Sequence, residues 1–419
     1  MSLRLRGKES LMLNPLKVLI GLIVVVLLWL PSLSTTLSCH VPPKQIVQNL
    51  EQATNWLEQK CQELIRAARR PMNNGVQAFL PQAGKGYDAF WLRDYVYMLE
   101  GCANAFTPDE LRQACTLFIT AARTDGAGVD CIKLDGTPIY KPGFGTMGQN
   151  PVADGSLFTI SLAWHTHQIL HDKAYLAEMI DRLKHILKAA PRSPTTKLIH
   201  IATTGYDRCP YGFMDTVHQQ GDIFFCSLLL VQAETQLADL MTIVGRIDEA
   251  EVYRRDAEKL ISHIHQIFWD AEAGLFRAAT HRCREHDLWG SAFAVHLGLT
   301  TSEQTERIAQ YLVQHHGEVF YRGQLRHLPA GVYWQEAGPR DAYQNGGFWA
   351  TPTGWAAVTL QRVNPQLAER TIVSLVQDFQ CNGVAEWIYD SKRAVPNYVA
   401  SVAMPLAGAR RLMQLRTKK

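Results

Sequence analysis

After residue 40, apolar residues recur at helical spacing along most of the chain, and strand-like alternation is limited to a few short runs. Two helix starts are marked by capping residues: Thr107 is followed by Pro108, and Thr301 is followed by Ser-Glu. The pattern predicts an all-α protein. Its helices are expected over residues 43–70, 93–105, 107–123, 154–170, 173–189, 221–244, 248–269, 287–297, 301–316, 354–361, 365–379 and 397–415.

The connections between these helices alternate between short and long. The long ones span residues 124–153, 192–220, 269–286, 317–354 and 380–396. Long loops inside a compact domain usually carry function. Helix, short turn, helix and long loop, repeated about six times, is the order that a ring of helical hairpins requires, with the long loops at one end. An α-solenoid would show a fixed sequence period, and none is found.

The N-terminal 1–39 segment is predicted to be separate from this domain, which is expected to span residues 40–419. Basic residues precede an apolar run from Val18 to Leu30, and a small polar stretch follows it. The run is shorter than the roughly 20 residues of a spanning helix and suits the core of a signal peptide. We expect an exported protein, with the segment either cleaved or kept as a membrane tether. A fortuitous apolar tail is the alternative.

Composition excludes several classes of function. The chain is 47% apolar and 19% charged, with a net charge of +3 and no basic stripe, so nucleic acid is not an expected partner. The nine cysteines form no Cys-x-x-Cys pair, and export would permit disulfides, although Cys115 and Cys226 lie in helical patterns typical of packed thiols. No metal, cofactor or nucleotide motif is found, and we expect a monomer that needs no cofactor.

Three segments combine aromatic rings with amides, hydroxyls or carboxyls. They span residues 343–355, 87–95 and 385–390. Buried amides and hydroxyls each need a partner, so a hydrophobic core has little use for this mixture. A sugar site does use it, because rings cover the apolar face of a pyranose and polar groups pair with its hydroxyls. The expected partner is a carbohydrate substrate.

Four motifs resemble the characteristic loops of the six-hairpin glycosidases, a superfamily that includes glucoamylases, trehalases, α-L-rhamnosidases, neutral invertases and exo-mannosidases. The motifs are Trp91-Leu-Arg-Asp94, Gly212-Phe-Met-Asp215, Tyr343-Gln-Asn-Gly-Gly-Phe-Trp349 and Ala385-Glu-Trp-Ile-Tyr389. The resemblance covers nearly all of the chain after the N-terminal segment. It implies an (α/α)6 barrel and, in most members, hydrolysis with inversion.

Inverting hydrolysis needs one carboxylic acid at the glycosidic oxygen and one carboxylate that activates water. By resemblance to glucoamylases and trehalases, Glu386 is the candidate base and Asp215 the candidate acid. The apolar surroundings of Asp215 would favour its protonated form. Asp154 competes for the acid role, because its segment resembles the acid loop of neutral invertases. Each of these carboxyls also has a structural interpretation, as a surface turn residue or a helix cap.

The remaining candidates are expected to bind the sugar. Arg93 and Asp94 resemble the pair that holds the hydroxyls of the terminal sugar, and they offer donors and acceptors in one place. Glu336 is a reserve base near the same rim. The other predicted substrate-binding residues are Tyr87, Trp91, Tyr343, Gln344, Asn345, Trp349 and Trp387.

The sequence thus predicts an exo-acting, inverting glycoside hydrolase that acts on a short saccharide or glycoconjugate. Two alternatives remain open at this point. A polysaccharide lyase on a similar helical toroid would want a Tyr or His base and positive charge against a uronate. A non-catalytic sugar-binding relative would keep the aromatic loops and lack one of the two carboxyls.

Overall fold

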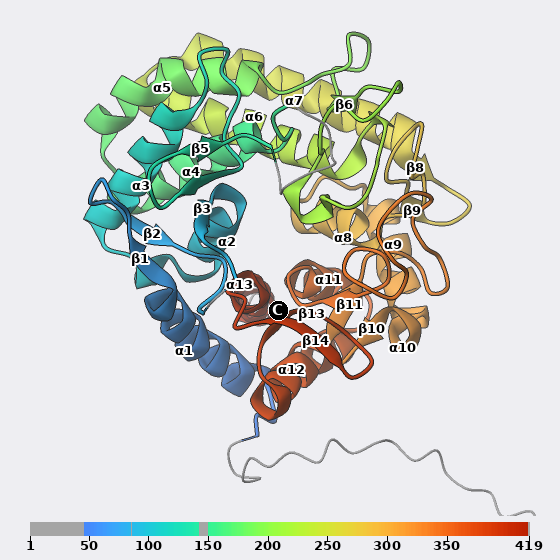
Figure 1. Ribbon diagram of the computed structural model, residues 1–419. Coiled ribbons are helices and arrows are strands. Elements are labelled where there is room, and N and C mark those ends of the chain that lie inside the picture. The colour runs from blue at the N-terminus through green and yellow to red at the C-terminus, as the bar shows by residue number, and fades with distance from the viewer. Residues whose placement is uncertain (1–45, 85, 142–149, 418–419) are drawn as a thin grey trace, which may run out of the picture. The chain divides into compact units, whose positions relative to one another are not determined.

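Two concentric rings of helices form the part of the chain that the computed structural model describes, residues 46–84, 86–141 and 150–417 (Figure 1). Each inner helix contacts the next inner helix, and the contact between the last and the first closes the ring. The inner helices are α2 (Leu92–Cys102), α4 (Gly155–Leu170), α6 (Phe224–Val244), α8 (Leu288–His296), α11 (Thr353–Leu360) and α13 (Ala400–Thr417). The outer helices are α1 (Leu50–Ala68), α3 (Pro108–Ala121), α5 (Lys173–Lys188), α7 (Ile247–Phe268), α9 (Ser302–Gln314) and α12 (Pro365–Asn382).

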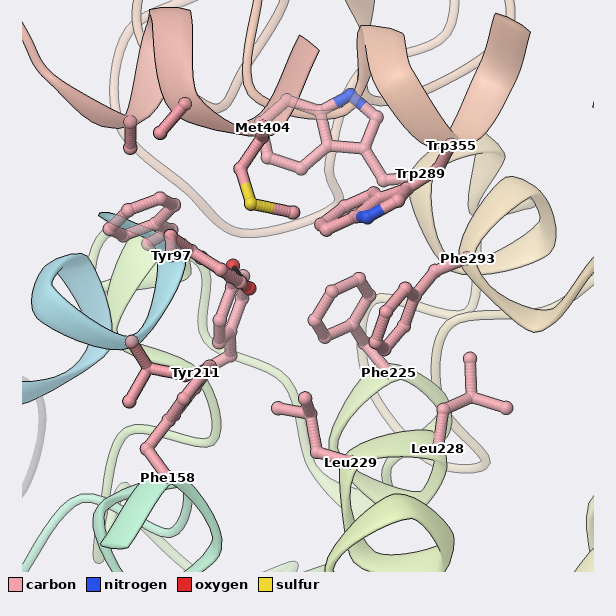
Figure 2. Packing of buried hydrophobic residues seen from close by; sticks show 14 of the residues in the cluster. Tyr97, Phe158, Tyr211, Phe225, Leu228, Leu229, Trp289, Phe293, Trp355 and Met404 are labelled. Atoms are coloured by element: carbon pink, nitrogen blue, oxygen red, sulfur yellow. Dashed lines mark hydrogen bonds between the residues drawn. The ribbon is translucent and has the colours of Figure 1, made fainter. Parts of the chain in front are cut away.

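The two rings differ in the distribution of their apolar residues. Outer helices such as α7 bury one stripe and expose charged residues on the opposite face, whereas α8 and α11 are buried on nearly all sides. Aromatic side chains from the inner helices and from one loop fill the centre of the barrel (Figure 2). The labelled members of this cluster include Tyr97, Phe158, Tyr211, Phe225, Phe293 and Trp355. Side chains therefore fill the interior of the barrel, and a substrate can enter only at one of its ends.

Glycines allow two of the inner helices to approach closely. A Cβ on Gly408 of α13 would lie 2.3 Å from the Cα of Gly354 in α11, closer than any real side chain could be placed. The absence of side chains at this crossing lets the backbones of α11 and α13 pack directly against each other.

Short strands occupy the long connections, as the sequence predicts. The first loops hold β1 (Arg69–Pro71), β2 (Gln77–Phe79), β3 (Ala89–Trp91), β4 (Cys131–Lys133), β5 (Pro138–Ile139), β6 (His200–Ile201), β7 (Gly221–Asp222), β8 (Trp269–Asp270) and β9 (Leu275–Phe276). The last loops hold β10 (Phe320–Tyr321), β11 (Gln324–Arg326), β12 (Phe348–Trp349), β13 (Ala385–Tyr389) and β14 (Lys392–Pro396). These last five form one antiparallel sheet in chain order, which ties the loop before α11 to the loop before α13.

Most helix boundaries agree with the sequence pattern, and the differences have local causes. Both predicted caps are confirmed as capping boxes, at Thr107 and at Thr301. The first helix starts at Leu50, with Asn49 as its cap, later than the predicted residue 43. The sixth helix starts three residues late because Gly221 and Asp222 pair with β6 instead. Residues 316–319 form a separate turn, α10 (His316–Val319).

The predicted export segment, residues 1–39, lies outside the described residues. The unit formed by Cys39–Lys419 is compact. Within the described ranges, none of the helices has the length and apolar character that a membrane span requires. Cys115 and Cys226 are buried free thiols, as their helical context predicts.

Candidate active site

A cavity of about 240 Å³ is lined by residues of the connections between helices and by Arg93 and Asp94 at the start of α2. These connections precede α2, α4, α6, α11 and α13, so segments far apart in the sequence meet around one space. The lining residues are Gly86, Tyr87, Asp88, Trp91, Arg93, Asp94, Asp130, Gly212, Phe213, Asp215, Tyr343, Glu386 and Tyr398. The cavity thus contains both of the carboxyls predicted as acid and base.

Glu386 is the second residue of β13, and the sheet holds it rigidly. Its side chain is 3% exposed, and the hydroxyl of Tyr87 donates a hydrogen bond of 2.8 Å to Oε1. Burial, together with the nearby Asp94 and Asp215, raises the pKa of Glu386 to about 8, against the lowering effect of the hydrogen bond from Tyr87. A carboxyl in this setting can hold a proton at neutral pH.

Asp215 follows a single 3-10 turn, η3 (Gly212–Met214), in the loop before α6. Its Oδ1 is buried and has no hydrogen-bond partner. Burial raises the pKa of Asp215 to about 6, against the lowering effects of the Tyr343 hydroxyl and of Arg93. An unpaired buried oxygen facing a cavity is costly unless a ligand or water pairs with it.

Asp94 is a third buried carboxyl in the cavity wall. It is 2% exposed, and Tyr398 donates a hydrogen bond of 2.6 Å to its Oδ1. Burial raises its pKa to about 6, although Tyr398 and Arg93 favour the charged form. Burial also raises the pKa of Asp130, and four carboxyls with raised pKa values in one cavity are typical of a catalytic site.

Arg93 lines the cavity and also belongs to a buried ion cluster. Its guanidinium donates to Asp154 from Nε (2.8 Å) and from Nη2 (3.2 Å), and Nη2 also donates to Asp130 (2.8 Å). A Cβ on Gly212 would lie 1.6 Å from Nη2, so only glycine lets this backbone pass over the guanidinium. The Arg93 side chain therefore supports the loop that leads to Asp215.

Asp154, the competing candidate for the acid, does not line the cavity. Both of its oxygens accept from Arg93, and Oδ2 also accepts the backbone N–H of Gly212 at 2.9 Å. It is fully buried at the start of α4 and makes no capping hydrogen bond. Asp154 thus lies outside the cavity lining with both of its oxygens bound by the chain, and Asp215 is the better placed candidate for the acid.

The glycine-rich segment contributes less to the cavity than the sequence predicts, since only Tyr343 lines it. The amide of Asn345 accepts from Trp334 N–H (2.9 Å) and donates to Gly338 C=O (2.7 Å). Trp349 is fully buried and donates to the carbonyl of Tyr343 at 3.1 Å. These side chains shape the loop and do not face the cavity.

Three further candidates lie away from the cavity lining. The side chain of Gln344 is fully buried and bonded to neighbouring loops. Trp387 follows Glu386 in the strand and so points to the opposite face of the sheet, where Lys392 covers its ring. Glu336 is bonded by Tyr206, His218 and Arg282, which lower its pKa to about 2.

That low pKa suits a structural ion pair, and Glu336 lies outside the cavity lining, so Glu386 remains the candidate base. Tyr87 and Trp91, in contrast, form one wall of the cavity, with ring centroids 4.9 Å apart at 82°.

Several lining residues carry no signal in the sequence. Asp130 stands alone in an apolar context, and Phe213 looks like a core residue. Tyr398 lies three residues after Val395, just before α13, and only the tertiary contact with Asp94 reveals its role. Neither motif nor spacing marks these residues. Among the described residues, no cluster of three His, Cys, Asp or Glu side chains could hold a metal ion.

Sequence comparisons identify no relative: no family model matches the chain, and no curated protein matches it significantly. Solved structures are similar in fold. A glucoamylase from Saccharomycopsis fibuligera gives a TM-score of 0.60 at 13% identity, covering 90% of this chain and 98% of that one. A GH63 mannosylglycerate hydrolase from Thermus thermophilus gives 0.61 at 13% identity, covering 84% and 99%.

A rhamnosidase from Klebsiella oxytoca is also similar, with a TM-score of 0.59 at 14% identity. The match covers 86% of this chain and 64% of the rhamnosidase, so the present chain spans less than two thirds of that enzyme. At such low identity these likenesses establish the fold. The predicted all-α (α/α)6 barrel, the architecture of the six-hairpin glycosidases, is confirmed.

Proposed function

We propose that the protein is a glycoside hydrolase that releases a terminal sugar with inversion of configuration. The observation that carries this proposal is the meeting of Asp215 and Glu386 in one cavity, both buried and both with raised pKa values. Two carboxyls that face one space supply the acid and the base of glycoside hydrolysis. The fold shared with known glycosidases supports the same conclusion.

In the proposed reaction, Glu386 accepts a proton from a water molecule as the water oxygen bonds to the anomeric carbon. Asp215 donates its proton to the glycosidic oxygen as the bond between that oxygen and the anomeric carbon breaks. The water attacks the face opposite the leaving group, which inverts the configuration. The carboxyls of an inverting enzyme lie about 6.5–9.5 Å apart, which leaves room for that water.

The proposed reaction needs the proton on Asp215 and the carboxylate form of Glu386. Glu386 has the higher pKa, about 8 against about 6 for Asp215, which favours the proton on Glu386. A bound glycoside reverses the order. Its glycosidic oxygen accepts a hydrogen bond only from protonated Asp215, and a water that donates to Glu386 stabilises the carboxylate. The two carboxyls titrate as a coupled pair that carries one proton in the active state.

The size of the cavity supports exo action. Its volume of about 240 Å³ is below the roughly 300–1,000 Å³ typical of sites for drug-sized ligands. One sugar ring matches such a space better than several do. Asp94 and Arg93 would orient that ring, and Tyr87, Trp91 and Tyr343 would cover its faces.

The other two functions considered are less well supported. A lyase acting on uronates needs positive charge in the site, but Arg93 is already paired with two carboxylates, and the cavity holds an excess of acidic side chains. A non-catalytic binder would lack one of the two carboxyls, and this chain has both.

The test is a screen of chromogenic monosaccharide glycosides in both anomeric configurations. We expect turnover of at least one glycoside and loss of that turnover in Glu386→Gln. Binding of a sugar by the parent without hydrolysis of any glycoside would favour the binding relative and contradict the proposal.

A further inference from the structure

The amide of Gln344 joins two loops that carry catalytic candidates. Its Nε2 donates to the backbone carbonyl of Phe213, two residues before Asp215. Because a carbonyl can only accept, the atom facing it must be nitrogen, and Oε1 therefore faces His327 Nδ1 at 3.1 Å. His327 Nδ1 in turn must carry a proton, so both groups of the amide are used. Gln344 is fully buried and is not one of the residues that line the cavity.

His327 is held in place from its other sides. Its ring stacks on Trp289, with centroids 4.1 Å apart and planes at 7°, and it is 1% exposed. Its Nε2 lies 3.2 Å from Oδ1 of Asp287, which caps α8 by accepting the N–H of Gly290. His327 Nε2 makes no hydrogen bond to Asp287, so the hydrogen-bonded connection runs from His327 Nδ1 through Gln344 to the Asp215 loop.

The residue before Gln344 contacts Asp215 itself. Tyr343 lines the same cavity as Asp215, and its hydroxyl lowers the pKa of the Asp215 carboxyl. Its backbone has φ of 47°, a left-handed conformation that costs energy for a tyrosine and is often kept at functional sites. The N–H of Gly347 and the indole of Trp349 both donate to its carbonyl at 3.1 Å and hold it there.

We propose that Gln344, oriented by His327, is a positioning residue that fixes the Asp215 carboxyl against Tyr343 for proton donation. The inference rests on the proposed hydrolytic function. Tyr343 orients the Asp215 carboxyl. Gln344 fixes the position of the backbone that carries this carboxyl, through its bond to the carbonyl of Phe213. Arg93, Asp130 and Glu386 also face this carboxyl through space, so a displacement of the loop changes every charge interaction that controls its proton.

Gln344→Met keeps the size of the side chain and removes both hydrogen bonds. We expect kcat to fall roughly 10- to 100-fold, the scale of a misplacement of about 1 Å, with KM changed less than about threefold. Because proton donation is impaired, the loss should be largest for glycosides with poor leaving groups, and the limb of the pH profile that reports Asp215 should move. His327→Phe keeps the stack on Trp289 and should give the same pattern if Gln344→Met does not fold.

Asn345→Met is the matched control. Asn345 is a neighbouring buried amide whose bonds stay within its own loop, so its loss should lower stability without any dependence on the leaving group. The positioning role would be overturned if the Gln344 and His327 variants lost the same factor in kcat on all leaving groups and kept the pH profile of the parent. That result would leave the proposed hydrolytic function intact.

A parent that hydrolyses no glycoside would refute the proposed function instead. In that case, carbon-13 NMR titration of the Asp215 carboxyl, identified with Asp215→Asn, still tests the positioning. We expect its midpoint to differ between the parent and Gln344→Met, and an unchanged midpoint would overturn the inference.

Discussion

At the scale of single residues, the chemistry depends on carboxyls placed where water is largely excluded. Asp215 and Glu386 are distant in sequence but line the same cavity. Asp215 raises the pKa of Glu386, and both carboxyls raise the pKa of Tyr87. Burial is the largest cause of the raised pKa in both cases. Because the two carboxyls have different proposed roles, we expect different effects on activity when each is replaced.

The proposed roles can be separated by the leaving group of the substrate. Asp215→Asn should lose most activity on alkyl glycosides, roughly 10²–10⁴-fold for a lost general acid, and much less on glycosyl fluorides, which need no proton. Glu386→Gln should lose activity on both, because water activation is needed in every case. The ratio of kcat/KM values on the two substrate types measures this. The opposite pattern would exchange the two roles.

The raised pKa of Glu386 also predicts a pH-dependent stability. Between its ordinary pKa and about 8, the folded state holds a proton that the unfolded state has released. The free energy of unfolding therefore falls as pH rises through this window. Replacing Glu386 by Gln removes that effect, so the variant should gain melting temperature relative to the parent at pH 8 and gain little at pH 4. Thermal melts at the two pH values check this, and an equal difference at both would count against a protonated Glu386.

At the scale of elements, the sequence predicts helices better than it predicts the loops. The helical period and the caps at Thr107 and Thr301 are local signals, and both caps are confirmed. The direction in which each polar side chain of the glycine-rich segment points cannot be read from local signals. Nothing in the sequence distinguishes Tyr343, which faces the cavity, from Asn345, whose amide holds its own loop. Tertiary contacts decide between these outcomes.

The crossing of α11 and α13 gives a prediction at the same scale. Gly408→Val should destabilise the protein by about 1–3 kcal/mol, as overpacking does, because the new side chain would overlap the backbone of Gly354. Gly317→Ala is the control, since a Cβ there meets no atom within 4 Å. Denaturant unfolding measures both variants. A stable Gly408→Val protein would mean that the two helices can separate at little cost.

At the scale of the whole barrel, the alternation of short and long connections determines where the site forms. The long loops before α2, α4, α6, α11 and α13 all contribute to the cavity. The order of elements predicts the ring and the grouping of its long loops at one end, whereas Asp215 and Glu386 are identified by resemblance. The sequence could not predict that Asp154 is sequestered by Arg93, because that depends on how α2, α4 and the Asp215 loop pack.

The central claim is that these two carboxyls hydrolyse a glycosidic bond across a single cavity. Its most direct test follows the anomeric proton of the first sugar released from the best glycoside in the screen, by proton NMR before mutarotation. We expect a product of the opposite anomeric configuration, formed by the parent and lost in Glu386→Gln. A product that retains the configuration of the substrate, or undiminished release by Glu386→Gln, would contradict it.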